Sequence, residues 1–107
     1  MGEKRDSLGS FEEIILRIVL GLGKEAYGVR VRQKAEQAME KSVAIGAIYT
    51  TLDRLERKGF VSSWQGEATP ERGGRAKRYF RVESPGIRAL NNAEETRRRV
   101  SEGLALA

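Results

Sequence analysis

Cationic side chains are concentrated in one short segment of the chain, around the pair Gly73–Gly74. The cationic residues of this segment are Arg72, Arg75, Lys77 and Arg78. Like charges at this density repel one another unless salt or a polyanion neutralises them. Each phosphate of a duplex that a protein neutralises contributes about −0.9 to the slope of log affinity against log salt. The segment therefore predicts a polyanionic partner such as nucleic acid.

The residues ahead of this segment have the spacing of an amphipathic helix. It begins at Ile45 or Gly46 and ends at Lys58, and Gly59 is its left-handed stop. The buried stripe contains Ile45, Ile48, Leu52 and Leu55. The candidate DNA-contacting residues on and beside the opposite face are Ala47, Tyr49, Thr50, Thr51 and Arg54. Threonine can contact a base edge or a thymine methyl group, and arginine can pair with guanine or phosphate. We expect groove contact here; the alternative is an ordinary solvated face.

Two aromatic residues near these segments have more than one interpretation. Helical geometry places Tyr49 between the buried stripe and the exposed face. Its ring could pack against the following hairpin, or its hydroxyl could donate to a phosphate, and the sequence favours neither. Trp64 is the only tryptophan and lies in a predicted strand. We expect a structural role for it, and the sequence assigns no effector pocket.

The composition excludes several kinds of chemistry. The chain has no cysteine and no histidine, so disulfides, thiol nucleophiles, histidine acid–base catalysis and the usual zinc sites are excluded. The segment Gly21–Gly28 resembles a phosphate-binding loop, but no strand is predicted before it and the Lys-Ser/Thr ending is missing. The remaining carboxylates and lysines form no recognisable catalytic arrangement. We expect no enzyme activity, no cofactor and no metal.

Length and charge indicate one small domain with a basic excess. The chain has 107 residues, with 20 Lys and Arg against 15 Asp and Glu, for a net charge of +5. The longest apolar run, Ile14–Leu16, is far shorter than the roughly 20 residues that cross a bilayer. No signal peptide is recognisable, so we expect a cytoplasmic protein.

The remaining segments complete the predicted architecture. Residues 1–9 are polar, which predicts a flexible N-terminus, and Ser10 begins a capping box with Glu13 ahead of the first helix. A second helix covers residues 27–40, and strands at 60–67 and 77–82 flank a glycine-containing tip. We expect a mostly α-helical fold with a small β-hairpin wing. Residues 10–83 form a winged helix-turn-helix DNA-binding domain, and residues 84–107 form a C-terminal dimerisation helix.

The chain resembles the PadR family of winged-helix transcriptional regulators over most of its length, from Phe11 to Leu90. The most specific segments are Tyr27–Gly28, Gly46–Tyr49, Leu52–Val61 and Gly73–Val82. The resemblance implies a homodimer, usually a repressor, that binds a pseudo-palindromic operator in double-stranded DNA. Small molecules often release such repressors from DNA.

The resemblance also implies roles for individual residues. Tyr49, Thr50, Thr51 and Arg54 would lie on the DNA-facing helix, and Arg75 and Lys77 on the wing. Dimerisation would use the C-terminal helix with help from the first one, through Phe11, Ile15, Leu90, Val100 and Leu104. The chain departs from the family pattern at Ala44, where a capping serine is common, and at Glu83, where a threonine is common.

A second hypothesis is a winged-helix module that binds an acidic protein and no DNA. A protein-binding face usually includes exposed large apolar residues. The predicted exposed face carries small side chains beside a cationic hairpin, which favours the DNA-binding hypothesis.

Overall fold

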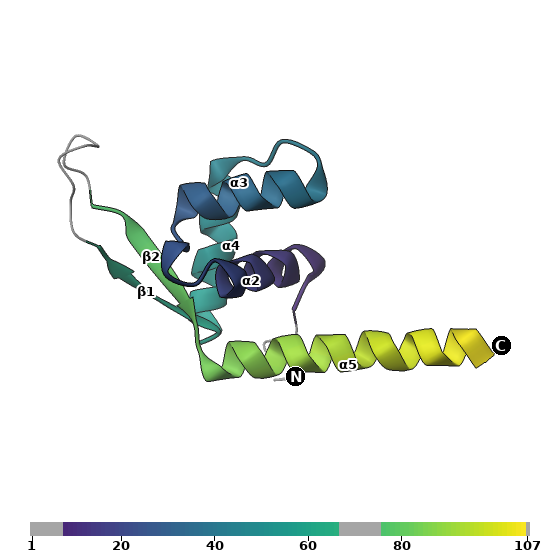
Figure 1. Ribbon diagram of the computed structural model, residues 1–107. Coiled ribbons are helices and arrows are strands. Elements are labelled where there is room, and N and C mark those ends of the chain that lie inside the picture. Colours follow the sequence, from purple (N-terminus) through teal and green to yellow (C-terminus); the bar gives the residue numbers. More distant parts are fainter. Residues whose placement is uncertain (1–7, 67–75, 107) are drawn as a thin grey trace.

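The structure is a computed structural model that describes residues 8–66 and 76–106. Its elements, in chain order, are α2 (Ser10–Leu22), the 3-10 turn η1 (Gly23–Glu25), α3 (Gly28–Met39), α4 (Ile45–Arg57), β1 (Val61–Gln65), β2 (Arg78–Val82) and α5 (Ser84–Leu106). Helices α2, α3 and α4 form a bundle with the hairpin at one side, and α5 projects beyond it (Figure 1). The predicted winged helix-turn-helix with a C-terminal helix is confirmed.

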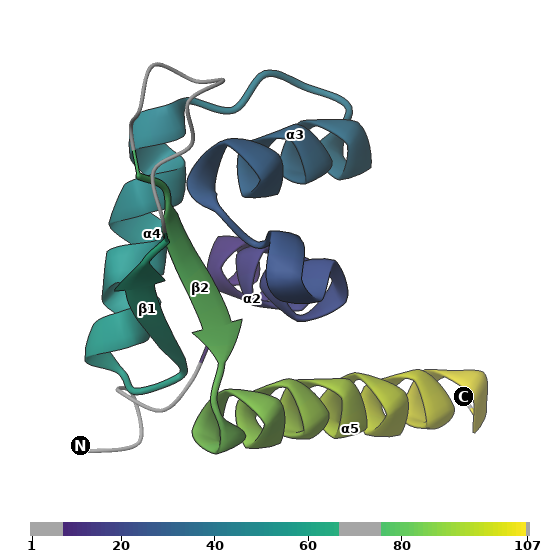
Figure 2. The same cartoon turned by 60° about the vertical axis from the view of Figure 1, so that its left-hand side comes forward.

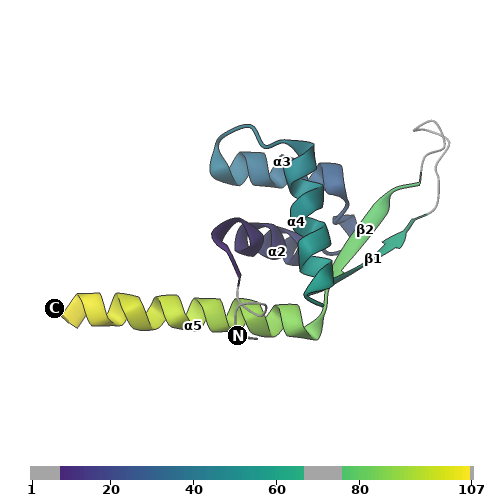
Figure 3. The same ribbon diagram turned by 180° about the vertical axis from the view of Figure 1, so that it is seen from behind.

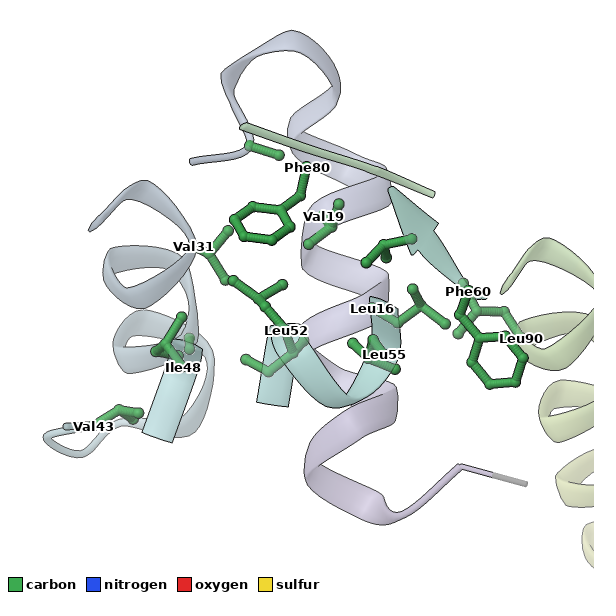
Figure 4. Close-up of a cluster of buried hydrophobic side chains, with 14 residues drawn as sticks. Leu16, Val19, Val31, Val43, Ile48, Leu52, Leu55, Phe60, Phe80 and Leu90 are labelled. Carbon is green, nitrogen blue, oxygen red and sulfur yellow. The ribbon is translucent and has the colours of Figure 1, made fainter. Parts of the chain in front are cut away.

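The hydrophobic core joins the three helices of the bundle to the second strand of the hairpin. Phe80 of β2 is fully buried and points toward Val19 of α2 and Val31 of α3 (Figure 4). The predicted stripe of α4 faces the same core, since Ile48, Leu52 and Leu55 are fully buried. Burying each such side chain stabilises the fold by roughly 1.5–3 kcal/mol. The core therefore fixes both the orientation of α4 and the position of the hairpin beside it.

The beginning of α2 differs from the prediction by one residue. The N-cap is Gly9, not Ser10, and the residue at the third helical position is Glu12, not Glu13. The Gly9 N–H donates to Glu12 Oε1 at 2.9 Å. The physical reason is that this register also lets the Glu12 carboxylate accept from Lys58 of the neighbouring segment, at 2.8 Å. The contact with Lys58 thus favours Glu12 over Glu13 at the third helical position.

Helices α3 and α4 meet at a position where only glycine fits. A Cβ atom built on Gly28 would overlap the hydroxyl and ring of Tyr49. Tyr49 is half-buried, and its ring packs against the beginning of α3. Helix α4 lies across α2 and α3 when the molecule is seen from behind (Figure 3). The Tyr27–Gly28 motif consequently sets the spacing of the helix-turn-helix.

The hairpin is a two-stranded antiparallel sheet with Val61 opposite Val82 and Gln65 opposite Arg78. The Phe80 N–H donates to the Ala26 carbonyl at 2.9 Å, which attaches β2 to the turn after α2. Figure 2 shows the hairpin alongside α4. The predicted tip, with Arg72 and Arg75, lies outside the described residues.

Helix α5 begins against the hairpin and then runs antiparallel to α2. Its start is close-packed, because a Cβ on Gly86 would overlap the carbonyl of Phe60. Further along, Arg97 donates to Glu13 at 2.6 Å and Arg17 donates to Glu94 at 3.3 Å. None of the helices within residues 8–66 and 76–106 has the length and hydrophobicity of a membrane span.

The two halves of α5 differ in burial, and this corrects part of the predicted dimer surface. Leu90 and Ile15 of α2 are buried inside their own chain, so the prediction that they form dimer contacts is wrong. The cause is that the first turns of α5 pack on the bundle. Val100 and Leu104 are 57% and 71% exposed, and Phe11 is half-buried. The exposure of Val100, Leu104 and Phe11 is compatible with the prediction that they form dimer contacts.

Candidate nucleic-acid interface

The N-terminal half of α4 presents small side chains to the outside. Ala47 and Thr50 are exposed, and a Cβ on Gly46 would meet no heavy atom within 4 Å. The N-cap residue Ala44 makes no side-chain hydrogen bond to the first turn. The departure from a capping serine therefore leaves the first N–H groups of α4 without a side-chain cap. Short side chains at this end would let the helix backbone approach a groove closely.

Thr51 does not share this outward face, which corrects the prediction. Its side chain is only 4% exposed, whereas its neighbour Thr50 is exposed. One residue along a helix is a rotation of about 100°, and this turns Thr51 toward the buried stripe of Ile48 and Leu52. Thr51 is therefore a packing residue and is no longer a candidate for DNA contact.

A buried carboxylate of α2, that of Glu12, forms ion pairs with the C-terminal part of α4. Glu12 is only 6% exposed, and its oxygens lie 2.8 Å from Lys58 Nζ and 3.9 Å from Arg54 Nε. Burial alone would raise the pKa of Glu12. Hydrogen bonds from Lys58 and the Gly9 N–H, with the charges of Lys58 and Arg54, outweigh burial and hold its pKa below the usual value.

This cluster changes the interpretation of Arg54. The Arg54 side chain is 50% exposed, so it remains accessible. Its positive charge is partly balanced by the carboxylate of Glu12. No local pattern in the sequence indicates this contact, because Glu12 and Lys58 belong to different helical segments. The local signal that could have indicated the contact is an acidic residue near the start of a mostly apolar helix. The predicted capping box explained that signal with Glu13 and so gave Glu12 no role.

Arg78 points from the hairpin back to α4. Its terminal nitrogens lie 3.1 Å from Asp53 Oδ1 and 2.7 Å from Glu56 Oε1. Its Nε donates to Ser63 at 3.2 Å, and Ser63 donates to Glu56 at 2.8 Å. The guanidinium also lies over the Phe80 ring, 4.8 Å from its centroid. Arg78 therefore connects the wing to α4, and sequence reasoning missed the two carboxylates that hold it.

Lys77 lies next to the undescribed tip and is only partly buried. Its Nζ is 4.2 Å from the centroid of the Tyr27 ring, and its carbonyl accepts from the Gly66 N–H at 2.7 Å. The face of an aromatic ring attracts a cation at this distance. Lys77 is thus a positioned cation at the base of the wing.

The geometry combines an exposed helix end with a hairpin held at a fixed position beside it. Helix α4 contacts β1, and Arg78 bridges α4 to β2. In the described part of the chain, no cluster of three or more acidic residues could hold a metal ion. The arrangement matches the docking geometry of a helix-turn-helix, in which the second helix of the pair lies in the major groove.

Comparison with known proteins gives the same assignment. The model of the "Transcriptional regulator PadR-like family" matches residues 15–92. No curated protein is similar enough in sequence to match the chain.

Several solved structures share the fold. A PadR-like transcription factor from Bacteroides fragilis is 22% identical, with a TM-score of 0.77, over 97% of this chain and 93% of that one. A PadR family regulator from Clostridium difficile R20291 is 22% identical, with a TM-score of 0.68, over 92% and 97%. A PadR-like regulator from Bacillus cereus is 21% identical, with a TM-score of 0.70, over 89% and 87%. The chain therefore belongs to the PadR-like family of transcriptional regulators, and it is a DNA-binding regulator, not an enzyme.

Proposed function

We propose that the protein is a homodimeric repressor in which two copies of α4 enter successive major grooves of a pseudo-palindromic operator. The exposed small-residue end of α4 beside a fixed hairpin is the observation that carries this proposal. The half-sites of such a dimer are about one helical turn of DNA apart. The proposal includes a cytoplasmic location, as expected of a regulator that must reach its DNA, and release of the DNA by a small-molecule effector.

Each DNA-facing residue has a proposed role. Ala47 and Thr50 approach base edges or thymine methyl groups, and Arg54 contacts a base or phosphate near the end of the groove contact. Tyr49 has a packing role instead of a DNA contact, since its ring fills the space over Gly28 of α3, a contact that neither interpretation of the sequence named.

The wing contributes contacts that do not depend on sequence. Lys77 binds a phosphate, together with Arg72 and Arg75 of the tip. Arg78 acts indirectly, because its partners Asp53 and Glu56 occupy its guanidinium.

The proposed dimer surface is the distal part of α5 with the beginning of α2. Val100 and Leu104 are large apolar side chains exposed on a helix that extends past its own bundle (Figure 1). Exposed apolar side chains at such a position favour packing against a second copy. Phe11 of α2 lies half-buried and would join this surface.

Selection of bound duplexes from a random pool tests the proposal. We expect an inverted repeat, bound by two copies of the chain, with an affinity that falls steeply as salt rises. A chain that dimerises but binds no duplex even in dilute buffer would instead support the protein-interaction module. A monomer that ignores duplex DNA would refute both the dimer and the docking mode.

A further inference from the structure

Lys77, at the base of the wing, is held through both its backbone and its side chain. Its carbonyl accepts a hydrogen bond from the Gly66 N–H at 2.7 Å, across the hairpin. Its Nζ lies over the ring of Tyr27, 4.2 Å from the centroid. Tyr27 is the N-cap residue of α3 and so belongs to the helix-turn-helix. A ring of one DNA-binding element therefore contacts a cation of the other.

The Tyr27 ring is fixed in turn by the second strand of the hairpin. It meets the Tyr79 ring edge to face, with centroids 5.5 Å apart and planes 69° apart. Tyr27 and Tyr79 also form an antiparallel backbone bridge, and beside it the Phe80 N–H donates to the Ala26 carbonyl at 2.9 Å. The backbone bridge and the neighbouring ring together leave the Tyr27 side chain little freedom to move.

The Tyr79 ring is held from the first strand as well. Trp64 of β1 stacks on it, with centroids 5.9 Å apart and planes 19° apart. A Cβ on Gly66 would overlap the Tyr79 ring, so the ring lies directly against the end of that strand. Three aromatic rings thus form a continuous array from the outer strand of the wing to the beginning of α3, and the ammonium group of Lys77 lies at its end.

Lys77 differs from its neighbour Arg78 in the balance of its charge. Arg78 lies 3.1 Å from Asp53 and 2.7 Å from Glu56. Among the residues whose positions the structure describes, no carboxylate forms an ion pair with Lys77. An ammonium group has three N–H donors, and contact with a ring face leaves donors that point away from the ring. The aromatic array therefore fixes Lys77 without neutralising it.

We propose that Tyr27 is a positioning residue for DNA binding, whose ring holds the Lys77 ammonium group in the direction from which it meets a phosphate. A lysine side chain that is fixed before binding loses less conformational entropy on binding. The face of the ring makes the contact, so the hydroxyl of Tyr27 is not required. The phosphate contact of Lys77 is part of the proposed function, and the role of Tyr27 rests on it.

The position of Lys77 is tested first in the full chain without DNA. Protons above the face of an aromatic ring are shifted upfield, so the Lys77 Cε protons should resonate upfield of those of other lysines in a ¹H–¹³C spectrum. Lys77→Gln identifies the signal, because it is missing from that variant. The shift should persist in Tyr27→Phe, which keeps the ring, and disappear in Tyr27→Leu.

Titration with a random duplex then tests the positioning role. Tyr27→Leu should weaken binding about fivefold for each wing, with an unchanged salt slope because the charge of Lys77 remains. Lys77→Gln should instead reduce the salt slope. Tyr27→Phe should bind like the wild type. Adding Tyr27→Leu to Lys77→Gln should cause no further loss, since no ammonium group is left to position.

Other results would overturn the proposal. An unshifted Cε signal in the wild type refutes the contact with Tyr27, and a loss of DNA binding in Lys77→Gln would then leave the proposed function intact. Equal losses in Tyr27→Phe and Tyr27→Leu would assign the effect to the hydroxyl. A further loss in the double variant would show that Tyr27 does not act through Lys77. If the Cε signal is shifted but Lys77→Gln binds like the wild type, the proposed phosphate contact fails, and the positioning role fails with it.

Discussion

The two halves of α4 differ in how they are connected to the rest of the molecule. The N-terminal half exposes Ala47 and Thr50 and makes no side-chain cap. In the C-terminal half, Asp53 and Glu56 hold Arg78 of the wing, and Arg54 lies beside the buried carboxylate of Glu12. The first half is exposed, whereas the second half is connected by ion pairs to α2 and to the wing. A rigid support behind an accessible end lowers the entropy cost of docking.

The largest effect is expected where α4 contacts α3. In Gly28→Ala, the new Cβ overlaps the Tyr49 ring, so the ring or the helix must move. We expect a decrease of about 3 kcal/mol in the free energy of unfolding, measured with urea.

Gly46→Ala is the matched control for this variant, since a Cβ there meets no heavy atom within 4 Å. Its removal of a helical glycine should stabilise the fold by roughly 0.5–1 kcal/mol. A similar decrease in stability in both variants would contradict the close contact between Gly28 and Tyr49.

The buried carboxylate comes next. Glu12→Gln removes the charge that pairs with Lys58 and Arg54, and we expect it to lower the free energy of unfolding by about 2 kcal/mol at pH 7. Glu94→Gln, which breaks only exposed pairs, should cost less than about 0.5 kcal/mol.

Acid should reduce the difference between wild type and Glu12→Gln. The folded-state pKa of Glu12 lies below its ordinary value of 4.5. Its ionised form therefore stabilises the fold above that pH, and this contribution is lost as pH falls through the folded-state pKa. Urea unfolding between pH 7 and 3 measures the difference; a constant difference would contradict the ion pair.

Two cations of the wing are expected to have different roles: Arg78 supports the structure, and Lys77 binds DNA. Arg78→Gln should lower the free energy of unfolding by about 1 kcal/mol, because Asp53 and Glu56 lose the guanidinium that pairs with both carboxylates. Lys77→Gln should leave stability nearly unchanged but weaken binding to operator and random duplexes alike. It should also reduce the salt slope by about 0.9 for each phosphate that is no longer neutralised. Equal effects of the two variants on stability would refute this division.

The smallest change in stability is expected on the accessible face. Thr50→Ala should alter the free energy of unfolding by less than about 0.5 kcal/mol, yet reduce the preference for the selected operator by about 1 kcal/mol. Thr51→Ala, at the buried neighbour, should instead lower stability by about 1 kcal/mol and leave operator preference unchanged. Titration of both variants with operator and scrambled duplexes measures operator preference. A larger loss of preference in Thr51→Ala than in Thr50→Ala would contradict the prediction.

Local patterns in the sequence predicted most of the fold. The 3.6-residue spacing of Ile48, Leu52 and Leu55, followed by Gly59 at a φ of 80°, located the helix that carries the candidate interface. Alternation around Phe80 identified the returning strand. Such signals depend on neighbours within one or two turns, so the sequence alone contains them. It contains the family motifs for the same reason.

Only the tertiary structure decided which polar side chains are exposed on the candidate interface and which are buried or paired behind it. Thr50 and Thr51 are chemically equivalent, and packing against the bundle separates them. Glu12 accepts a hydrogen bond from Lys58, which lies 46 residues further along the chain. These contacts join residues far apart along the chain. Their partners are therefore set by how the helices pack, which no local pattern specifies.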